Sequence, residues 1–364
     1  MEGKKLRVGI LFGGKSAEHE VSLQSAKNIA DAIDKNKYEV CLIAIDKAGH
    51  WLLPNQAEFL LNTSDPKTIA LNTLGNESVA LVPQSSGEVT NLSRSGVLPA
   101  VDVVFPILHG PFGEDGTVQG LLKLAGVPFV GASVLGSAVG MDKDVMKRLL
   151  RDAGLPIAKF KVLRQGEVVD FVEISMELGT PLFIKPANLG SSVGVSKAKN
   201  KQEFEEAVAH AFEFDTKIIV EEFVAGRELE CAVLGNQNPD ASGVGEIIPH
   251  HEFYSYDAKY IDEDGASLII PADIPTEATE RLRSLATLVF KTLSCEGLAR
   301  VDFFYTKEGT LFVNEINTMP GFTNVSMYPR LWGAAGISYT DLISRLIDLA
   351  LERFAVEQKL KTMR

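Results

Sequence analysis

The chain has 364 residues, of which 45% are hydrophobic and 23% charged, and these proportions are typical of a globular protein with two or three domains. Its formal net charge is −12 and no basic block offsets it, which argues against binding to nucleic acid. The apolar run after the basic N-terminus ends at Gly13-Gly14 and is too short for a signal peptide. The uncharged stretch 124–141 contains Pro128 and several glycines, so we expect no membrane span. The cysteines are widely spaced among apolar residues, as is typical of free thiols in the cytoplasm.

The first part of the chain alternates strands with helices. The predicted strands are 6–12, 38–46 and 101–108, and the predicted helices are 22–33 and 117–125. This alternation is typical of a parallel sheet with helices on both faces. We therefore predict a doubly wound α/β domain over residues 1–140, with loops and minor strands in the polar stretch 62–96.

Beyond residue 140 the pattern becomes a mixed α+β one. The predicted helices are 144–153, 201–212, 276–293 and 340–354, and the predicted strands include 160–163, 182–186 and 217–222. A threonine stands where it would cap the start of each of the last two helices. We place a central lobe at 141–225 and a C-terminal lobe at 226–364.

Hard oxygen ligands interrupt two apolar runs near the C-terminus, where uncompensated carboxylates would be costly. If a two-residue loop joined these runs as a hairpin, Asp302 would pair with Glu315 and Arg300 with Asn317, so that all four side chains would share one face. Two carboxylates and an amide oxygen suit Mg²⁺ or Mn²⁺, and the arginine suggests that the bound species is an anion. A salt bridge on a solvated hairpin is the alternative.

The first strand and its turn match the P-loop pattern G-x-x-x-x-G-K-[ST] at 9–16. We reject a P-loop, because three of the four variable residues read as buried strand and leave only Gly13-Gly14 to turn. The loop that follows lies at the carboxyl end of a strand, which is the usual ligand edge of such a sheet. There Glu18 either meets a substrate ammonium or simply favours the helix N-terminus. Similarly, the acids of loop 109–116 either orient neighbouring groups or cap the next helix.

Three further segments carry groups suited to a nucleotide. Lys185 ends a strand and precedes a Gly/Ser turn whose backbone N–H groups could cover a polyphosphate. Glu221 and Glu222 end another strand, which either meets an adenine and a ribose or is an edge strand with solvated acids. The aromatic and polar segment 253–260 resembles a mobile lid that carries a cation. The adjacent His250-His251 pair is unsuited to a metal, because neighbours in a strand point to opposite sides.

Together these motifs resemble the ATP-grasp superfamily and, within it, the D-alanine:D-alanine ligases. The resemblance covers essentially the whole chain, in the order and spacing of that family, and its departures are minor: Leu189 stands where polar residues are common, and Asn314 interrupts an apolar strand. The motifs are GGKSAEHEVS (13–22), HGPFGEDGTVQG (109–120), KPANLGSSVGVSK (185–197), YDAKYIDEDG (256–265) and ARVDFF with NEINTMPGFTNVSMYP (299–329).

The resemblance implies a two-lobed ATP-grasp fold behind the first domain, with ATP between the lobes and two Mg²⁺ or Mn²⁺ ions. It implies a homodimer in the cytoplasm that makes D-alanyl-D-alanine, a peptidoglycan precursor, through a D-alanyl phosphate. The implied nucleotide residues are Lys143, Lys185, Ser192, Glu221, Glu222, Val224, Glu228 and Lys259. The implied metal ligands are Asp302, Glu315 and Asn317, with Glu315 bridging the two ions.

The resemblance also implies roles in catalysis. Glu18, Ser191 and Tyr260 would form a hydrogen-bonded trio that orients the first D-alanine, and the Tyr260 hydroxyl favours D-alanine over D-lactate as second substrate. The alternatives are an ATP-grasp ligase for another amino or hydroxy acid, and a nucleotide-binding regulator without catalysis. The groups expected to stabilise developing charge are Lys259, Arg300 and the Gly321 N–H, and those expected at the second carboxylate are Ser326 and Met327.

Overall fold

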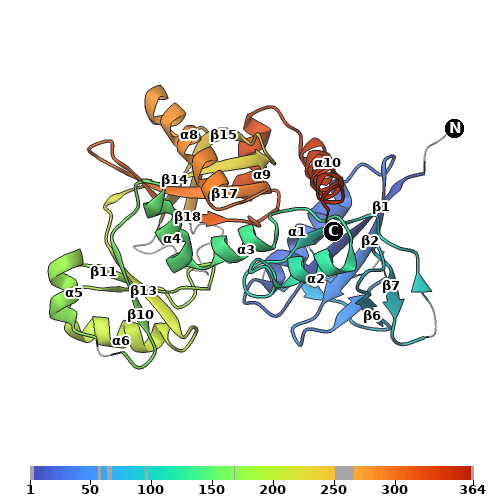
Figure 1. Ribbon diagram of the computed structural model, residues 1–364, viewed down its shortest axis with the longest axis horizontal. Helices are drawn as coiled ribbons and strands as arrows, with labels where there is room; N and C mark the ends of the chain where they lie inside the picture. Colours follow the sequence, from blue (N-terminus) through green and yellow to red (C-terminus); the bar gives the residue numbers. More distant parts are fainter. Residues whose placement is uncertain are drawn as a thin grey trace.

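The computed structural model describes residues 4–55, 59–63, 68–94, 97–167, 169–250 and 266–361. Within these residues the strands form three main sheets, two in adjoining lobes and one in the N-terminal part (Figure 1). The expected lid, with Lys259 and Tyr260, lies outside the described residues. In the described part, no helix combines the length and the hydropathy needed to cross a bilayer.

The described N-terminal sheet has the strand order β8-β7-β6-β3-β2-β1-β9. The three predicted strands, β2, β1 and β9, pair in parallel as expected, and the shorter strands β3, β6, β7 and β8 add an antiparallel half. Short connections join β2 to β3, β6 to β7 and β7 to β8, and a parallel pairing would need a long crossover instead. The strands are β1 Leu6–Gly13, β2 Tyr38–Ile45, β3 Trp51–Leu53, β6 Glu77–Leu81, β7 Val89–Asn91, β8 Val97–Leu98 and β9 Val103–Ile107, beside a separate pair of β4 Leu60–Leu61 and β5 Ala70–Leu71. The helices are α1 His19–Ala32 and α2 Thr117–Ala125.

The turn after β1 requires glycine. Gly13 has φ of +94°, and a Cβ there would lie 2.1 Å from the Ile45 carbonyl oxygen. Because β1 continues to Gly13, the segment that matches the P-loop pattern is mostly buried strand. The P-loop match is therefore a coincidence of letters.

Two helices connect the N-terminal part to the central lobe, α3 Val134–Met141 and α4 Lys143–Asp152. The central sheet has the order β10-β13-β11-β12, so β13 is an interior strand and the edge-strand alternative is wrong. The elements are β10 Phe160–Arg164, β11 Leu182–Pro186, β12 Ser196–Ala198, β13 Lys217–Glu222, α5 Phe171–Leu178 and α6 Lys201–Ala211.

The C-terminal sheet has the order β16-β15-β14-β17-β18. The predicted threonine caps are wrong: Pro275 precedes α8, and Ser338 caps α10 by accepting a hydrogen bond from the Asp341 N–H. Thr340 instead donates to the Ala32 carbonyl, 2.8 Å away on α1. The elements are β14 Gly226–Gly235, β15 Asp240–Pro249, β16 Ala266–Ile269, β17 Gly297–Thr306, β18 Leu311–Asn317, α8 Thr276–Thr292, α9 Met327–Ala334 and α10 Tyr339–Glu357.

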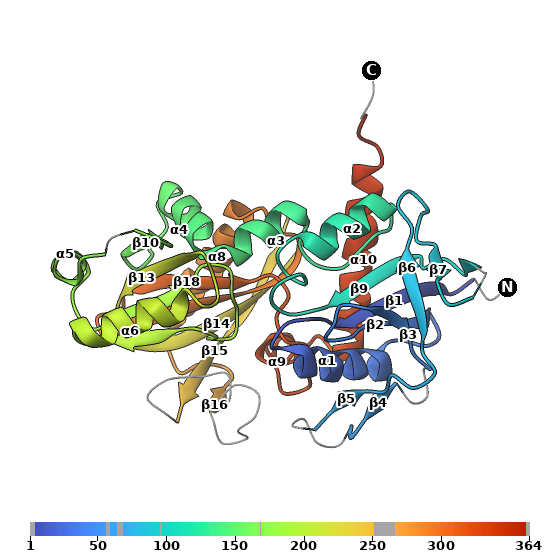
Figure 2. The ribbon, with the colours of Figure 1, turned by 90° about the horizontal axis from the view of Figure 1, so that it is seen from below.

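The last helix of the chain packs into the core of the first domain. Leu342, Leu346 and Ile347 of α10 belong to one buried cluster with Phe12 of β1 and Phe105 of β9. Figure 2 shows α10 lying against the N-terminal sheet on the side of β9 and β1. The chain thus returns to its first domain after the C-terminal lobe.

The β17-β18 hairpin contains a β-bulge. Residues 307–309 form its loop, and the register shifts at Asn314, because Asp302 pairs with Glu315 while Phe303 pairs with Val313. The predicted pairs are therefore confirmed, whereas the two-residue loop assumed for them is wrong. The extra residue switches the alternation of the strand, since it puts Val313 and Ile316 in the core and turns Glu315 to the other face.

Candidate active site

The site is assembled from all three sheets, beginning with a carboxylate of the first domain. Glu18, just before α1, accepts a hydrogen bond from the Ser191 hydroxyl in the loop between β11 and β12. Glu18 is buried, and Gly110 and Gly190 pass so close that an added Cβ would lie 3.4 and 3.3 Å from its Oε2. This contact joins the N-terminal domain to the Gly/Ser loop of the central lobe.

A buried histidine adjoins this contact. His109 Nδ1 lies 3.0 Å from the Met319 carbonyl oxygen and 3.5 Å from Glu114 Oε1. Burial opposes protonation of His109, but Glu114 and the charge of Glu18 outweigh it and raise the pKa of the imidazole. The acids of loop 109–116 therefore do orient a neighbouring group, and Asp115 also accepts from the Thr117 N–H at the start of α2.

The lysines of the central lobe surround one carboxylate. Glu221 forms two ion pairs, in which its Oε1 lies 2.5 Å from Lys147 Nζ and its Oε2 lies 2.5 Å from Lys185 Nζ. Burial opposes ionisation of Glu221, but the two lysines outweigh it and lower its pKa to about 2. The Lys143 ammonium lies 2.6 Å from the Leu189 carbonyl oxygen and 3.6 Å from Glu315 Oε2, so it connects the Gly/Ser loop to the hairpin of the C-terminal lobe.

The β17-β18 hairpin presents the expected ligand set on one face. Arg300 binds Asp302 through two hydrogen bonds of 2.7 Å, and Asn317 Nδ2 donates to Asp302 Oδ2 at 3.0 Å. The same guanidinium lies 2.9 Å from Glu230, a buried carboxylate on β14. Among the described residues no cluster of three or more His, Cys, Asp or Glu surrounds one point, and the expected set contains only two carboxylates.

The loop before α9 holds the remaining expected groups. The Ser326 hydroxyl accepts from the Thr323 N–H at 3.0 Å and lies 2.8 Å from the Thr323 hydroxyl. A Cβ on Gly321 would approach Ser326 Oγ to 3.0 Å, so the loop closes tightly on itself. Met327 is buried at the first position of α9.

The other expected nucleotide residues lie around β13. Glu222 is engaged in the sheet, because its Oε1 accepts from the Lys159 N–H at 2.7 Å and its own N–H donates to the Lys159 carbonyl. Val224 follows the end of β13. Glu228 lies on β14, the next strand along the chain and a member of the C-terminal sheet, where it contributes to the raised pKa of Lys185. Ser192 has φ of +60° in the Gly/Ser loop.

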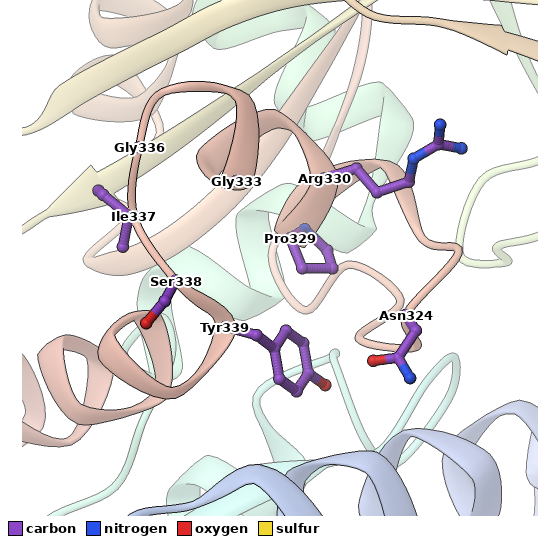
Figure 3. A pocket seen from close by; sticks show the side chains of 8 residues that line it. All are labelled: Asn324, Pro329, Arg330, Gly333, Gly336, Ile337, Ser338 and Tyr339. Atoms are coloured by element: carbon purple, nitrogen blue, oxygen red, sulfur yellow. The ribbon is translucent and has the colours of Figure 1, made fainter.

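A surface pocket of about 400 Å³ adjoins the loop before α9 (Figure 3). It is bounded by α9 and the start of α10, and Tyr339 at its edge donates to the Phe322 carbonyl. None of the residues expected to bind ATP or metal lines it. The lining residues are Asn324, Pro329, Arg330, Gly333, Gly336, Ile337, Ser338 and Tyr339.

Sequence reasoning missed Lys147, Glu230 and His109. Lys147 follows Lys143 by one helical turn, and it occupies the same buried face as Met146 and Leu150. A lysine at a core-facing helix position was the available signal. For Glu230 the signal was an acid inside the apolar run 229–234, which β14 buries.

The lowered pKa of Glu221 predicts a pH effect on stability. Because the folded pKa of about 2 lies below the ordinary value of 4.5, the carboxylate stabilises the fold above pH 4.5 and loses this contribution as the pH falls towards 2. The difference in unfolding free energy between the wild type and Glu221→Gln should decrease by about 2 kcal/mol when the pH is lowered from 5 to 3. Urea unfolding of both proteins at the two pH values measures it, and a constant difference would contradict the prediction.

The lysine cluster on one lobe and the acidic hairpin on the other, with Lys143 between them, define an ATP-grasp fold. Two family models match the chain, D-ala D-ala ligase N-terminus over residues 7–132 and D-ala D-ala ligase C-terminus over residues 149–348. The chain belongs to the D-alanine–D-alanine ligase family. It is 56% identical over 361 residues to D-alanine–D-alanine ligase A of Salmonella typhimurium, covering 98% of this chain and 99% of that protein.

Solved structures agree with this assignment. The D-alanine–D-alanine ligase of Coxiella burnetii superposes with a TM-score of 0.86 at 38% identity, over 98% of this chain and 97% of that one. The VanG D-Ala:D-Ser ligase of Enterococcus faecalis has a TM-score of 0.84 at 38% identity, over 95% and 100%. The D-alanine–D-alanine ligase of Bacillus anthracis, solved in complex with ATP, has a TM-score of 0.73 at 29% identity, over 98% and 100%.

Proposed function

We propose that this chain joins two molecules of D-alanine to D-alanyl-D-alanine with ATP, through a D-alanyl phosphate, and so supplies a precursor of the bacterial cell wall. The observation that carries the proposal is the contact of Lys143 with both the Gly/Ser loop and Glu315. This contact places lysines that could bind phosphates next to carboxylates that could bind metal ions. We keep the division into domains 1–140, 141–225 and 226–364 as part of this proposal.

ATP would lie between the two lobes. Lys143 and Lys185 would neutralise its phosphates, and the Gly/Ser loop with Ser192 would cover them. Both ammonium groups are held at the lobe boundary by carboxylates, Lys143 by Glu315 and Lys185 by Glu221. The adenine would lie near the end of β13, and the ribose near Glu228. The residues proposed there are Glu221, Glu222 and Val224.

The hairpin donors fit a hard divalent cation. Asp302, Glu315 and Asn317 share one face, are partly buried, and are held beside the cations Arg300 and Lys143, which suits a site for metal-bound phosphate. We propose that these three residues would hold two Mg²⁺ or Mn²⁺ ions. When bound, such ions offset the charge of the phosphate oxygens.

The protein groups then account for the reaction. A carboxylate is a poor electrophile because its leaving group would be oxide, so the first D-alanine must be activated by phosphoryl transfer. Arg300 and the lysines offset charge as the phosphoryl group moves, mostly through position and preorganised electrostatics. The amine of the second D-alanine next attacks the acyl phosphate, and the Gly321 N–H would donate to the oxyanion before phosphate leaves.

The two amino acids are placed by separate groups. Glu18, oriented by Ser191, would bind the first D-alanine, whereas Ser326 and Met327 would meet the carboxylate of the second. Lys259 and Tyr260 are expected to complete these contacts. The homodimer and the cytoplasmic location remain proposals that rest on the family.

A ligase with another acceptor is the second candidate, because the D-Ala:D-Ser ligase of Enterococcus faecalis matches this fold nearly as well as the D-alanine enzymes. A regulator without catalysis is disfavoured, since a binding protein has no need of groups such as Arg300 that are aimed at developing charge.

The decisive experiment is incubation of the purified chain with ATP, Mg²⁺ and racemic alanine, followed by chiral analysis of the product. We expect D-alanyl-D-alanine and stoichiometric phosphate. Parallel reactions with D-serine or D-lactate as second substrate test the alternative acceptor, and phosphate release without any dipeptide would contradict the proposal.

A further inference from the structure

Lys147 is a buried lysine for which the proposed reaction has no role. Its side chain is 2% exposed, it pairs with Glu221 at 2.5 Å, and it lies 5.8 Å from the centre of the Phe160 ring. Burial lowers its pKa, so the cost of keeping this ammonium charged is offset mainly by Glu221.

The three charged groups form a row from the core to the lobe boundary. Lys147 lies deepest, Glu221 at 4% exposure separates it from Lys185, and Lys185 is 15% exposed. Each carboxylate oxygen of Glu221 serves one ammonium group. The row therefore carries one net positive charge, and that charge faces outward at Lys185.

Without Lys147, the row would be neutral. Glu221 would have only Lys185 as its partner, and the attraction between them would compete with any anion that approaches Lys185. We propose that Lys147 is a positioning residue that takes up the charge of Glu221, so that Lys185 keeps its own charge for the phosphates of the bound nucleotide. This inference rests on the proposed function, because it places nucleotide phosphates beside Lys185.

A purely structural role would be to fasten α4 to the central sheet. That role is already filled, because Lys217 of β13 binds both oxygens of Asp142 at 2.7 and 2.5 Å and lies 3.2 Å from Asp144. Lys143 further ties the start of α4 to the Leu189 carbonyl. The arrangement at Lys147 thus points to charge rather than to attachment.

The test is the dependence of binding on the number of phosphates. In Lys147→Met, measured by calorimetry without D-alanine, we expect the affinity for ATP and ADP to fall by about 10- to 100-fold and that for adenosine by less than about 3-fold. KM for ATP should rise more than kcat falls. Lys161→Met removes two surface ion pairs, with Glu173 and Glu177, from the same lobe and should leave all three affinities unchanged.

A charge-balanced variant makes the test independent of folding. Lys147→Met combined with Glu221→Gln removes two buried charges together and returns the row to one positive charge at Lys185. Because Glu221 is also proposed beside the adenine, which ATP and adenosine share, the readout is the ratio of their affinities. We expect the double variant to recover the wild-type ratio, whereas Lys147→Met alone does not. The recovery would not occur if Lys147 were only an anchor for α4.

Equal loss of ATP and adenosine in Lys147→Met, or a double variant without preference for phosphates, would overturn the inference. The wild type separates this result from a failure of the proposed function. If the wild type binds ATP and makes dipeptide, the variants report on Lys147 alone. If it does neither, the proposed function fails first.

Discussion

Arg300→Ala should abolish nearly all dipeptide synthesis, with kcat lower by about 1,000-fold or more. The guanidinium lies within 2.7 to 2.9 Å of Asp302 and Glu230, on the face where phosphoryl transfer is proposed. An alanine offers no charge to the moving phosphoryl group or to the tetrahedral intermediate. Steady-state release of phosphate in the presence of D-alanine measures this loss.

Arg300→Ala should also affect folding, because the arginine lies 2.9 Å from Glu230. Glu230 is buried, so removal of its arginine partner should destabilise the fold by about 3 kcal/mol or more. Arg300→Ala combined with Glu230→Gln should restore much of the stability but none of the activity. If this stable double variant regained substantial turnover, Arg300 would have no catalytic role.

Glu315→Gln should have the second-largest effect, a loss of about 100-fold or more in kcat at millimolar Mg²⁺. Glutamine keeps the shape of the side chain but removes the charge that is expected to hold two ions. Activity should return in part at higher Mg²⁺ or with Mn²⁺, because weaker binding is overcome by concentration. Titration of activity with each metal measures this shift.

The control is Glu308→Gln, in the loop of the same hairpin. Glu308 is exposed and lies far along the hairpin from the ligand set, so its charge should not matter. Binding of Mn²⁺ followed by electron paramagnetic resonance gives a readout apart from turnover. Equal Mn²⁺ affinity in Glu315→Gln and the wild type would show that the metal is held elsewhere.

Local pattern and motif spacing predicted most elements and the pairing of the ligand hairpin. The predicted pairing is correct although the predicted two-residue loop is wrong. The actual loop is longer and shifts the register one way, and the bulge at Asn314 shifts it back. Asn314 was visible in the sequence as a polar interruption of an apolar strand. The sequence does not show that this residue forms a bulge, because a bulge is defined by the pairing with the partner strand.

Contacts between distant elements were beyond the sequence. The Lys147–Glu221 and Arg300–Glu230 pairs each join residues about 70 positions apart, and no local pattern reports such partners. The antiparallel half of the first sheet consists of short strands with weak β-propensity. These strands form because they pair with their neighbours in the folded protein, and local sequence does not report that pairing. The motifs thus identified the groups, and the fold determined which of them meet.

The return of α10 to the first sheet bears on how the protein is made. Because Leu342, Leu346 and Ile347 fill the core beside Phe12 and Phe105, the first domain cannot be complete until these residues of α10 have been synthesised. A nascent chain would leave the ribosome with an apolar surface of its oldest segment still open to chaperones. The order of synthesis and the order of folding are therefore uncoupled for this domain, because its core closes only when α10 has docked against β1 and β9.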